Sequence, residues 1–119
     1  MSDSTAQTTR QLKIKTGVVK RLFKEERTYY QEAEQARAKL QKMRDEDAEG
    51  ADIRNAERVV KDSEQMIPRT KKSLDEAVVA LEDLVDGMSS DETITATQEY
   101  KDAAEQLKVV KQAGTQNGA

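Results

Sequence analysis

The chain has 119 residues, of which 36% are charged and only 3% aromatic, a composition that suits one small domain of long, thin helices. It contains no Cys, His or Trp, which excludes thiol chemistry, disulfide bonds, zinc sites of the Cys/His type and catalysis by histidine. No apolar run approaches the ~20 residues needed to span a bilayer, so we expect a soluble, cytoplasmic protein that makes no use of a membrane.

The first predicted helix covers residues 8–45. Residues 1–7 are small and polar and predict a disordered tail, whereas Thr8 and Gln11 resemble a capping box at a helix start. Apolar residues then recur every seven positions in two rows, which are Leu12, Val19, Ala33 and Leu40 in one, and Leu22, Tyr29, Ala36 and Met43 in the other. Glu26 interrupts the first row, and Phe23 and Tyr30 widen the stripe. A stripe of this width predicts packing against two neighbours.

A second helix is predicted over residues 52–87, after a reversal at 45–52 in which Gly50 turns the chain and Asp52 caps the helix. Two rows with a spacing of seven run along this helix and read as positions a and d of a heptad. The a row is Ile53, Val60, Ile67, Leu74, Leu81 and Met88; the d row is Ala56, Ser63, Thr70, Ala77 and Leu84.

Pro68 lies inside this second helix, where a proline forfeits the hydrogen bond to the carbonyl of Glu64 and typically costs ~3 kcal/mol. The spacing of seven is kept across it, so we expect a continuous helix that is kinked at Pro68 with the ring facing solvent. The kink has two possible interpretations. Its freed backbone groups are satisfied by the hydroxyls of Ser63 and Thr70, or the bend serves as a hinge or recognition feature.

The third helix is predicted over residues 90–112, with Gly87 as a left-handed cap of the preceding helix and Ser89 and Glu92 as a capping box. Its apolar rows are weaker; they are Thr93, Tyr100 and Leu107 in one, and Ala96, Ala103 and Val110 in the other. Residues 113–119 predict a disordered tail. Two short connections between long helices predict an all-α fold, an antiparallel three-helix bundle with coiled-coil-like packing.

Cofactor and metal sites are not expected. The five glycines are isolated from one another, so no nucleotide-binding loop is present. Asp45, Asp47 and Glu49 imitate the start of a calcium loop, but Ala56 stands where the bidentate Glu is needed, and a solvated turn is the better interpretation. Glu26 faces the seam and is better interpreted as an acid satisfied by a neighbouring Lys, Arg or Tyr, or at a partly wet edge of the bundle, than as a catalytic acid, so an enzyme is not expected.

Positive charge is concentrated near the start of the first helix. Residues 10–27 hold seven basic and two acidic side chains, a net charge of +5, whereas the whole chain carries -3. Six of the basic residues point away from the apolar seam; they are Arg10, Lys13, Lys20, Arg21, Lys24 and Arg27. No aromatic residue is interleaved for base stacking, so an acidic protein surface is a better candidate partner than nucleic acid. A solvated helix face with no partner is the alternative.

The same stretch carries a family resemblance. The segment QLKIKTGVVKRLFKEE, residues 11–26, resembles the signature of the tubulin-binding cofactor A family, and KMRDED at 42–47, MIP at 66–68 and EYKDA at 99–103 follow in the family's order. The resemblance covers roughly residues 9–110. It implies a three-helix bundle without enzymatic activity that captures β-tubulin released from the cytosolic chaperonin and passes it on towards the αβ-heterodimer.

The resemblance also implies contact residues, which are Lys13, Lys15, Thr16, Gly17, Lys20, Arg21, Lys24 and Pro68. It further implies other tubulin-folding cofactors as partners, no bound cofactor, and a cytoplasmic protein associated with the cytoskeleton. A monomer is expected, because an up-down-up bundle buries its apolar seam within one chain. A homodimer is the alternative. The alternative function is a structural coiled-coil adaptor or homodimeric scaffold for an unrelated complex, which heptads alone would support equally.

Overall fold

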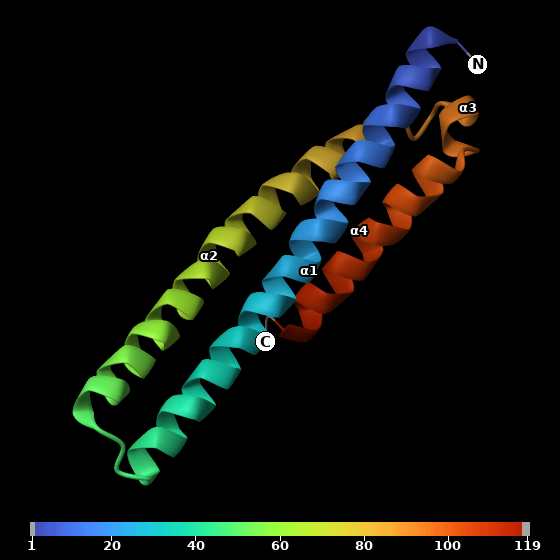
Figure 1. Ribbon diagram of the computed structural model, residues 1–119. Coiled ribbons are helices and arrows are strands. Elements are labelled where there is room, and N and C mark those ends of the chain that lie inside the picture. Colours follow the sequence, from blue (N-terminus) through green and yellow to red (C-terminus); the bar gives the residue numbers. More distant parts are fainter. Residues whose placement is uncertain (1, 118–119) are drawn as a thin grey trace. The chain divides into compact units, whose positions relative to one another are not determined.

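The computed structural model describes residues 2–117, with side chains up to Gly114, and contains four helices in this part of the chain. They are α1 (Asp3–Asp45), α2 (Gly50–Gly87), α3 (Glu92–Thr95) and α4 (Gln98–Asn117) (Figure 1). No strand occurs among the described residues, so the all-α prediction is confirmed. None of the described helices is long and apolar enough to cross a membrane.

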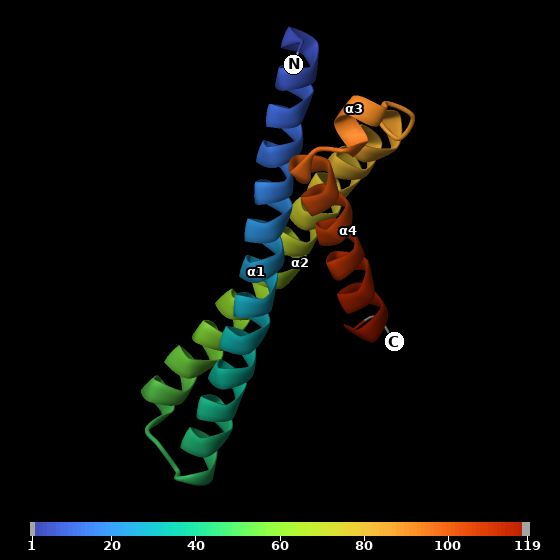
Figure 2. The same ribbon diagram turned by 90° about the vertical axis from the view of Figure 1, so that its right-hand side faces the viewer.

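The chain divides into two compact units, each of which has its own packing. The core unit comprises the residues up to Phe23 and those from Ser73 onward, so it holds the first half of α1, the second half of α2, α3 and α4. The hairpin unit comprises Lys24–Lys72, the second half of α1 and the first half of α2. In Figure 2 the two arms of the hairpin unit run antiparallel and are joined by one short connection.

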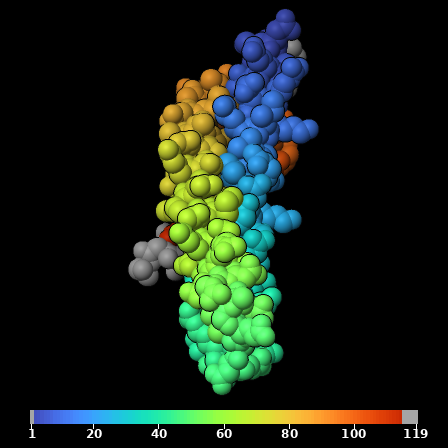
Figure 3. Space-filling view, turned by 60° about the vertical axis from the view of Figure 1, so that its left-hand side comes forward, coloured from blue at the N-terminus to red at the C-terminus, as the bar shows by residue number. Residues whose placement is uncertain are grey.

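The core unit is held together by one apolar cluster to which all of its helices contribute. Its buried members are Leu12, Val19, Leu74, Leu81, Val85, Ile94, Ala103 and Leu107. Five of them are less than 2% exposed, and these are Leu12, Val19, Leu81, Ile94 and Ala103. Figure 3 shows the outer surface of this packing, with the first half of α1 in blue beside the second half of α2 in yellow. Within this unit α1 and α4 run in the same direction and α2 runs in the opposite one (Figure 1).

The hairpin unit buries smaller side chains. Its buried residues are Ala33, Leu40, Ala56 and Thr70, of which only Leu40 is large and apolar. Ion pairs between its arms include Arg37 with Glu64 at 3.0 Å and Arg44 with Glu57 at 3.8 Å. All four side chains are about half exposed, so each pair contributes little, about 0–1 kcal/mol. The hairpin therefore depends mainly on its narrow apolar seam.

The seam predicted along α2 is confirmed at every position. All eleven residues of the two rows are buried or half-buried, including the polar Ser63 and Thr70. Pro68 lies inside the continuous α2 and is exposed, as expected from the unbroken spacing of seven. The kink itself stays a prediction. In α1 both rows are also covered, and Glu26 is half-buried, but Tyr30 is 47% exposed and does not widen the packed stripe.

The start of α1 differs from the prediction. The helix begins at Asp3 rather than Thr8, because Ser2 caps it: the backbone N–H of Thr5 donates to Ser2 Oγ at 3.1 Å. Residues 3–7 are therefore helical where a disordered tail was predicted. At the other end α4 continues to Asn117 instead of ending at residue 112, and Gly118 and Ala119 lie outside the described residues.

The two reversals also use other residues than predicted. Between α1 and α2 the left-handed backbone conformation falls on Asp47 (φ 54°), and α2 begins at Gly50, before Asp52. Aspartate tolerates this conformation better than most residues, since its short polar side chain can bond locally. None of the described glycines has a positive φ, so Gly87 is not a left-handed cap.

The predicted third helix is in fact two helices, which corrects the picture of three continuous helices. Asp91, not Ser89, caps α3: its carboxylate accepts from the backbone N–H groups of Thr93 (3.0 Å) and Ile94 (3.2 Å). The chain breaks at Ala96 and Thr97, and the Thr97 hydroxyl donates to Ile94 O at 2.6 Å while accepting from the N–H of Tyr100. This break lets Ile94 enter the core, and it leaves Thr93 and Ala96 exposed.

Candidate functional site

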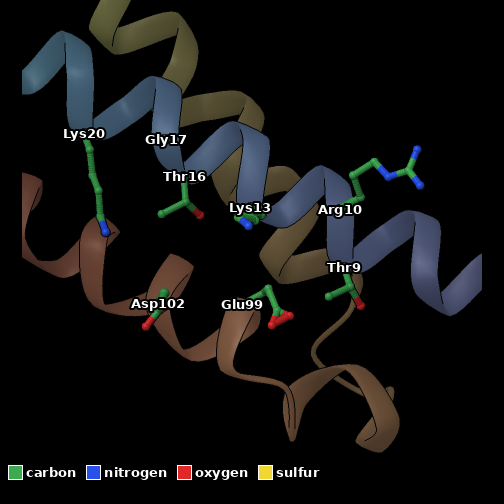
Figure 4. Close-up of a pocket in the computed structure, with 8 residues that line it drawn as sticks. All are labelled: Thr9, Arg10, Lys13, Thr16, Gly17, Lys20, Glu99 and Asp102. Atoms are coloured by element: carbon green, nitrogen blue, oxygen red, sulfur yellow. The ribbon is translucent and has the colours of Figure 1, made fainter. Parts of the chain in front are cut away.

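A groove of about 710 Å³ lies on the core unit, between the first half of α1 and the start of α4 (Figure 4). The residues that line it are Thr9, Arg10, Lys13, Thr16, Gly17 and Lys20 from α1, with Glu99 and Asp102 from α4. Basic residues thus form one wall and carboxylates stand on the other. The volume lies within the range of ~300–1,000 Å³ that is usual for ligand sites.

The wall formed by α1 follows from helical spacing. Positions that are three or four residues apart lie on one helix face, so Arg10, Lys13, Gly17 and Lys20 form a single row. From Thr9 to Lys20 this wall is about 16 Å long at 1.5 Å per residue. In Figure 4 the side chain of Lys20 extends from α1 towards α4, Lys13 is seen nearly end-on beside α1, and Arg10 points away from the groove. Lys13 and Lys20 therefore supply the positive charge inside it.

The wall formed by α4 consists of the first turns of that helix. Glu99 is half-buried and Asp102 is exposed, and both stand on α4 in Figure 4. Asp102 accepts a hydrogen bond from Gln98 Nε2 at 2.8 Å. In the described part of the chain, neither acid forms an ion pair with Lys13 or Lys20. The groove therefore presents charges of opposite sign on its two sides, and both signs remain accessible to a ligand.

Thr16 and Gly17 form the middle of the α1 wall. Thr16 is 5% exposed and donates its hydroxyl proton to Leu12 O at 2.6 Å, so this proton is used within α1. Gly17 is exposed, and a Cβ atom added there would meet no heavy atom within 4 Å. The helix surface at Gly17 is thus bare backbone that a ligand can approach closely.

Replacing Gly17 with Ala is expected to raise the free energy of unfolding by about 1 kcal/mol. The new methyl group has room, and alanine removes the helix-propensity cost of an interior glycine. Thermal unfolding followed by circular dichroism measures the change. The matched control is Gly114→Ala in α4, where a Cβ atom also meets nothing within 4 Å. A fall in stability for Gly17→Ala alone would mean that the site is tighter than the structure shows.

The groove brings together four of the eight predicted contact residues, which are Lys13, Thr16, Gly17 and Lys20. The other four do not line it. Lys15 is half-buried, and Arg21 is exposed but outside the groove. Lys24 and Pro68 are exposed residues of the hairpin unit.

Four lining residues were absent from the predicted contacts, namely Thr9, Arg10, Glu99 and Asp102. Arg10 had been recognised only as part of the basic face. The motif EYKDA, residues 99–103, did contain a usable signal, because Glu99 and Asp102 are three residues apart and so share a helix face. No pattern in the sequence indicated that this face would lie opposite Lys13.

A smaller hollow of about 280 Å³ lies on the hairpin unit. Its lining residues are Ala36, Lys39, Met43, Asp52, Asn55, Ala56 and Val59. Four of these residues are apolar and three are polar, with no concentration of one charge. Elsewhere, the described residues contain no group of three or more acidic side chains that could hold a metal ion.

Comparison with known proteins finds a family match. Residues 7–107 match the family model described as tubulin binding cofactor A, and this range includes every residue that lines the groove. The chain belongs to the tubulin binding cofactor A family. The family resemblance seen in the first helix is thus confirmed over most of the chain.

Individual relatives match this chain over most of their length. Tubulin-specific chaperone A of Homo sapiens is 40% identical over 102 residues, which are 86% of this chain and 92% of that protein. The structure of human tubulin chaperone cofactor a has a TM-score of 0.74 at 38% identity and covers 87% of this chain and 98% of its own. That of tubulin folding cofactor A from Arabidopsis thaliana has a TM-score of 0.80 at 33% identity and covers 90% and 98%.

Proposed function

We propose that this protein is a tubulin chaperone that captures β-tubulin on its way to the αβ-heterodimer. Membership of the tubulin binding cofactor A family carries the proposal, because relatives at about 40% identity are named tubulin-specific chaperones. β-Tubulin as the client, other folding cofactors as further partners, action as a monomer and a cytoplasmic, cytoskeleton-associated location are parts of the same proposal.

The basic wall of the groove supplies the means of capture. Tubulin is an acidic protein, so the exposed Lys13 and Lys20 attract it at long range and raise the rate of encounter. The packed core behind this wall, with Leu12 and Val19 fully buried, keeps the helix face in one geometry. Little conformational entropy is then lost on binding.

Capture of this kind needs no nucleotide hydrolysis. If the chain binds the free β-subunit more tightly than the assembled heterodimer, it shifts the population of tubulin towards a reserve of free subunits. The free energy by which the chain shifts this equilibrium cannot exceed the difference between its binding free energies for the free subunit and the heterodimer. Release then follows whenever a partner in assembly binds the β-subunit more tightly.

The proposal is tested by co-elution of the purified protein with β-tubulin freshly released from chaperonin, and separately with assembled αβ-heterodimer. A complex with the free subunit and little with the heterodimer is the expected result. A chain that binds neither would instead fit the alternative, a helical adaptor for an unrelated complex, and its mass in solution would then show whether it self-associates.

Reversing the charge of both groove lysines, as Lys13→Glu with Lys20→Glu, is expected to weaken β-tubulin binding roughly tenfold. Each reversal removes one exposed attraction of up to ~1 kcal/mol and adds a repulsion. The affinity is measured by titration at fixed ionic strength, and the helical content by circular dichroism should not change.

The matched control reverses two exposed lysines of the hairpin unit, as Lys42→Glu with Lys61→Glu, which alters the net charge by the same amount. This control should bind β-tubulin within about threefold of the unaltered protein, because only long-range steering changes. Equal losses in the two double variants would show that net charge matters and the groove does not.

A further inference from the structure

The α1 wall of the groove contains a row of Lys13, Gly17 and Lys20, with the bare backbone of Gly17 between two ammonium groups. Both lysines are exposed and line the groove, and Lys20 extends towards α4 (Figure 4). A ligand backbone can therefore lie against the helix at Gly17 while its side chains reach a lysine on each side. A second helix, with a diameter of about 10–12 Å, would be held further from α1 by its own side chains.

The spacing of the two lysines matches an extended chain. Lys13 and Lys20 are seven residues apart, which is about 10.5 Å along the axis of α1. In the polyproline II conformation the rise is 3.1 Å per residue with three residues per turn, so side chains at i and i+3 share a side about 9.3 Å apart. Acidic segments repel themselves into extended forms of this kind. Two carboxylates three residues apart would reach both lysines together.

The opposite wall selects the residues that lie between those carboxylates. Glu99 and Asp102 stand on the α4 side, where a third acid of the ligand would be repelled and a hydrogen-bond donor or a basic side chain would be favoured. The groove therefore favours spaced acids over a continuous run of negative charge. A uniform polyanion such as nucleic acid meets the same repulsion.

We propose that this groove binds an extended acidic segment of a partner protein, with two carboxylates three residues apart on Lys13 and Lys20 and the backbone crossing Gly17. The proposal rests on the proposed function in one respect, namely that the segment belongs to the captured client. It adds the chemistry and the spacing that the client must present.

Fluorescent synthetic peptides test the proposal directly on the purified full chain. One probe carries two glutamates separated by two serines, with flanking serines, and the other has the same composition with the two glutamates adjacent. Fluorescence anisotropy at low ionic strength should show at least fivefold tighter binding of the spaced probe. Equal affinities, or no binding of either probe, would overturn the proposal.

Two substitutions then assign the binding to the groove. Gly17→Leu should weaken the spaced probe about tenfold without lowering thermal stability, since its side chain fills the crossing point and has room. Glu99→Gln should strengthen binding two- to fivefold, because it removes a facing negative charge. The control Glu105→Gln removes an exposed acid of α4 outside the groove and should have a smaller effect. Equal gains from both would overturn the groove assignment.

Measuring β-tubulin co-elution and probe binding on the same purified protein distinguishes the failure of one proposal from the failure of the other. If β-tubulin co-elutes but the spaced probe binds no better than the adjacent one, the segment proposal fails and the capture function stands. If the spaced probe binds selectively but β-tubulin does not co-elute, the groove has the proposed chemistry and the capture function fails.

Discussion

Replacing Leu81 by Ala is expected to lower the free energy of unfolding by about 3–5 kcal/mol, the usual range for a leucine truncated in a core that cannot collapse around the gap. Leu81 has no exposed surface and lies in the apolar cluster that joins α1, α2 and α4. Unfolding by urea, followed through the helical circular dichroism signal, measures the loss. For a domain of this size the same substitution should lower the melting temperature by ten degrees or more, at roughly 4–8 °C per kcal/mol.

The control for this substitution is Val79→Ala, two residues earlier in the same helix. Val79 is 56% exposed, so losing its methyl groups should change stability by less than about 0.5 kcal/mol. A similar loss at both positions would mean that the seam of α2 does not face the cluster as the structure shows.

Replacing Pro68 by Ala is expected to raise the free energy of unfolding by about 1–3 kcal/mol. Pro68 is exposed inside α2, and a proline there removes one backbone hydrogen bond and crowds the preceding turn. Alanine restores the N–H donor without disturbing a packed side chain. Urea unfolding gives the size of the gain.

The control Arg69→Ala alters the neighbouring exposed residue and should shift stability by less than about 0.5 kcal/mol. Absence of a gain for Pro68→Ala would show that α2 already compensates for the missing bond. The β-tubulin affinity of the same variant addresses the predicted contact role. Weaker binding by a more stable protein would support a bend that the client recognises.

The seam along α2 could be predicted because burial there follows from one repeated spacing. A helix fixes the direction of each side chain, so residues seven apart, from Ile53 to Met88, share a face whatever they pack against. The unbroken spacing across Pro68 likewise predicted a continuous helix, and the structure has one. The family resemblance came from residues 11–26 and was confirmed over residues 7–107.

Helix ends could not be predicted as well, because alternative caps differ in free energy by only about 1 kcal/mol. Ser2, Asp91 and Thr97 cap three helices where Thr8 and Ser89 had been expected to cap two. The break before α4 accompanies the burial of Ile94, which is 1% exposed, while the N–H of Ala96 still donates to Glu92 O at 3.2 Å and that of Thr97 to Ile94 O at 3.0 Å. Spacing within the segment gave no sign of this.

The two walls of the groove also differ in how well the sequence predicts them. Lys13 and Lys20 could be placed on one outer face from the period of α1 alone. Glu99 and Asp102 could not be placed opposite them, because that neighbourhood depends on how α4 packs against α1 through Ala103 and Leu107. Half of the site was therefore predictable from the sequence, and the other half required the folded chain.

The small buried side chains of the hairpin unit have a consequence for how the chain opens. Leu40 is the only large apolar residue among the buried residues of this unit, so its local unfolding exposes less fully buried apolar surface than unfolding of the core unit would. Its cooperative opening therefore costs less free energy than opening the core unit does. Amide protons of Lys24–Lys72 would exchange with solvent through such partial openings, and those around Leu12 and Leu81 only when the whole chain unfolds. The hairpin unit is thus expected to open locally while the core unit, which carries Lys13 and Lys20, stays folded.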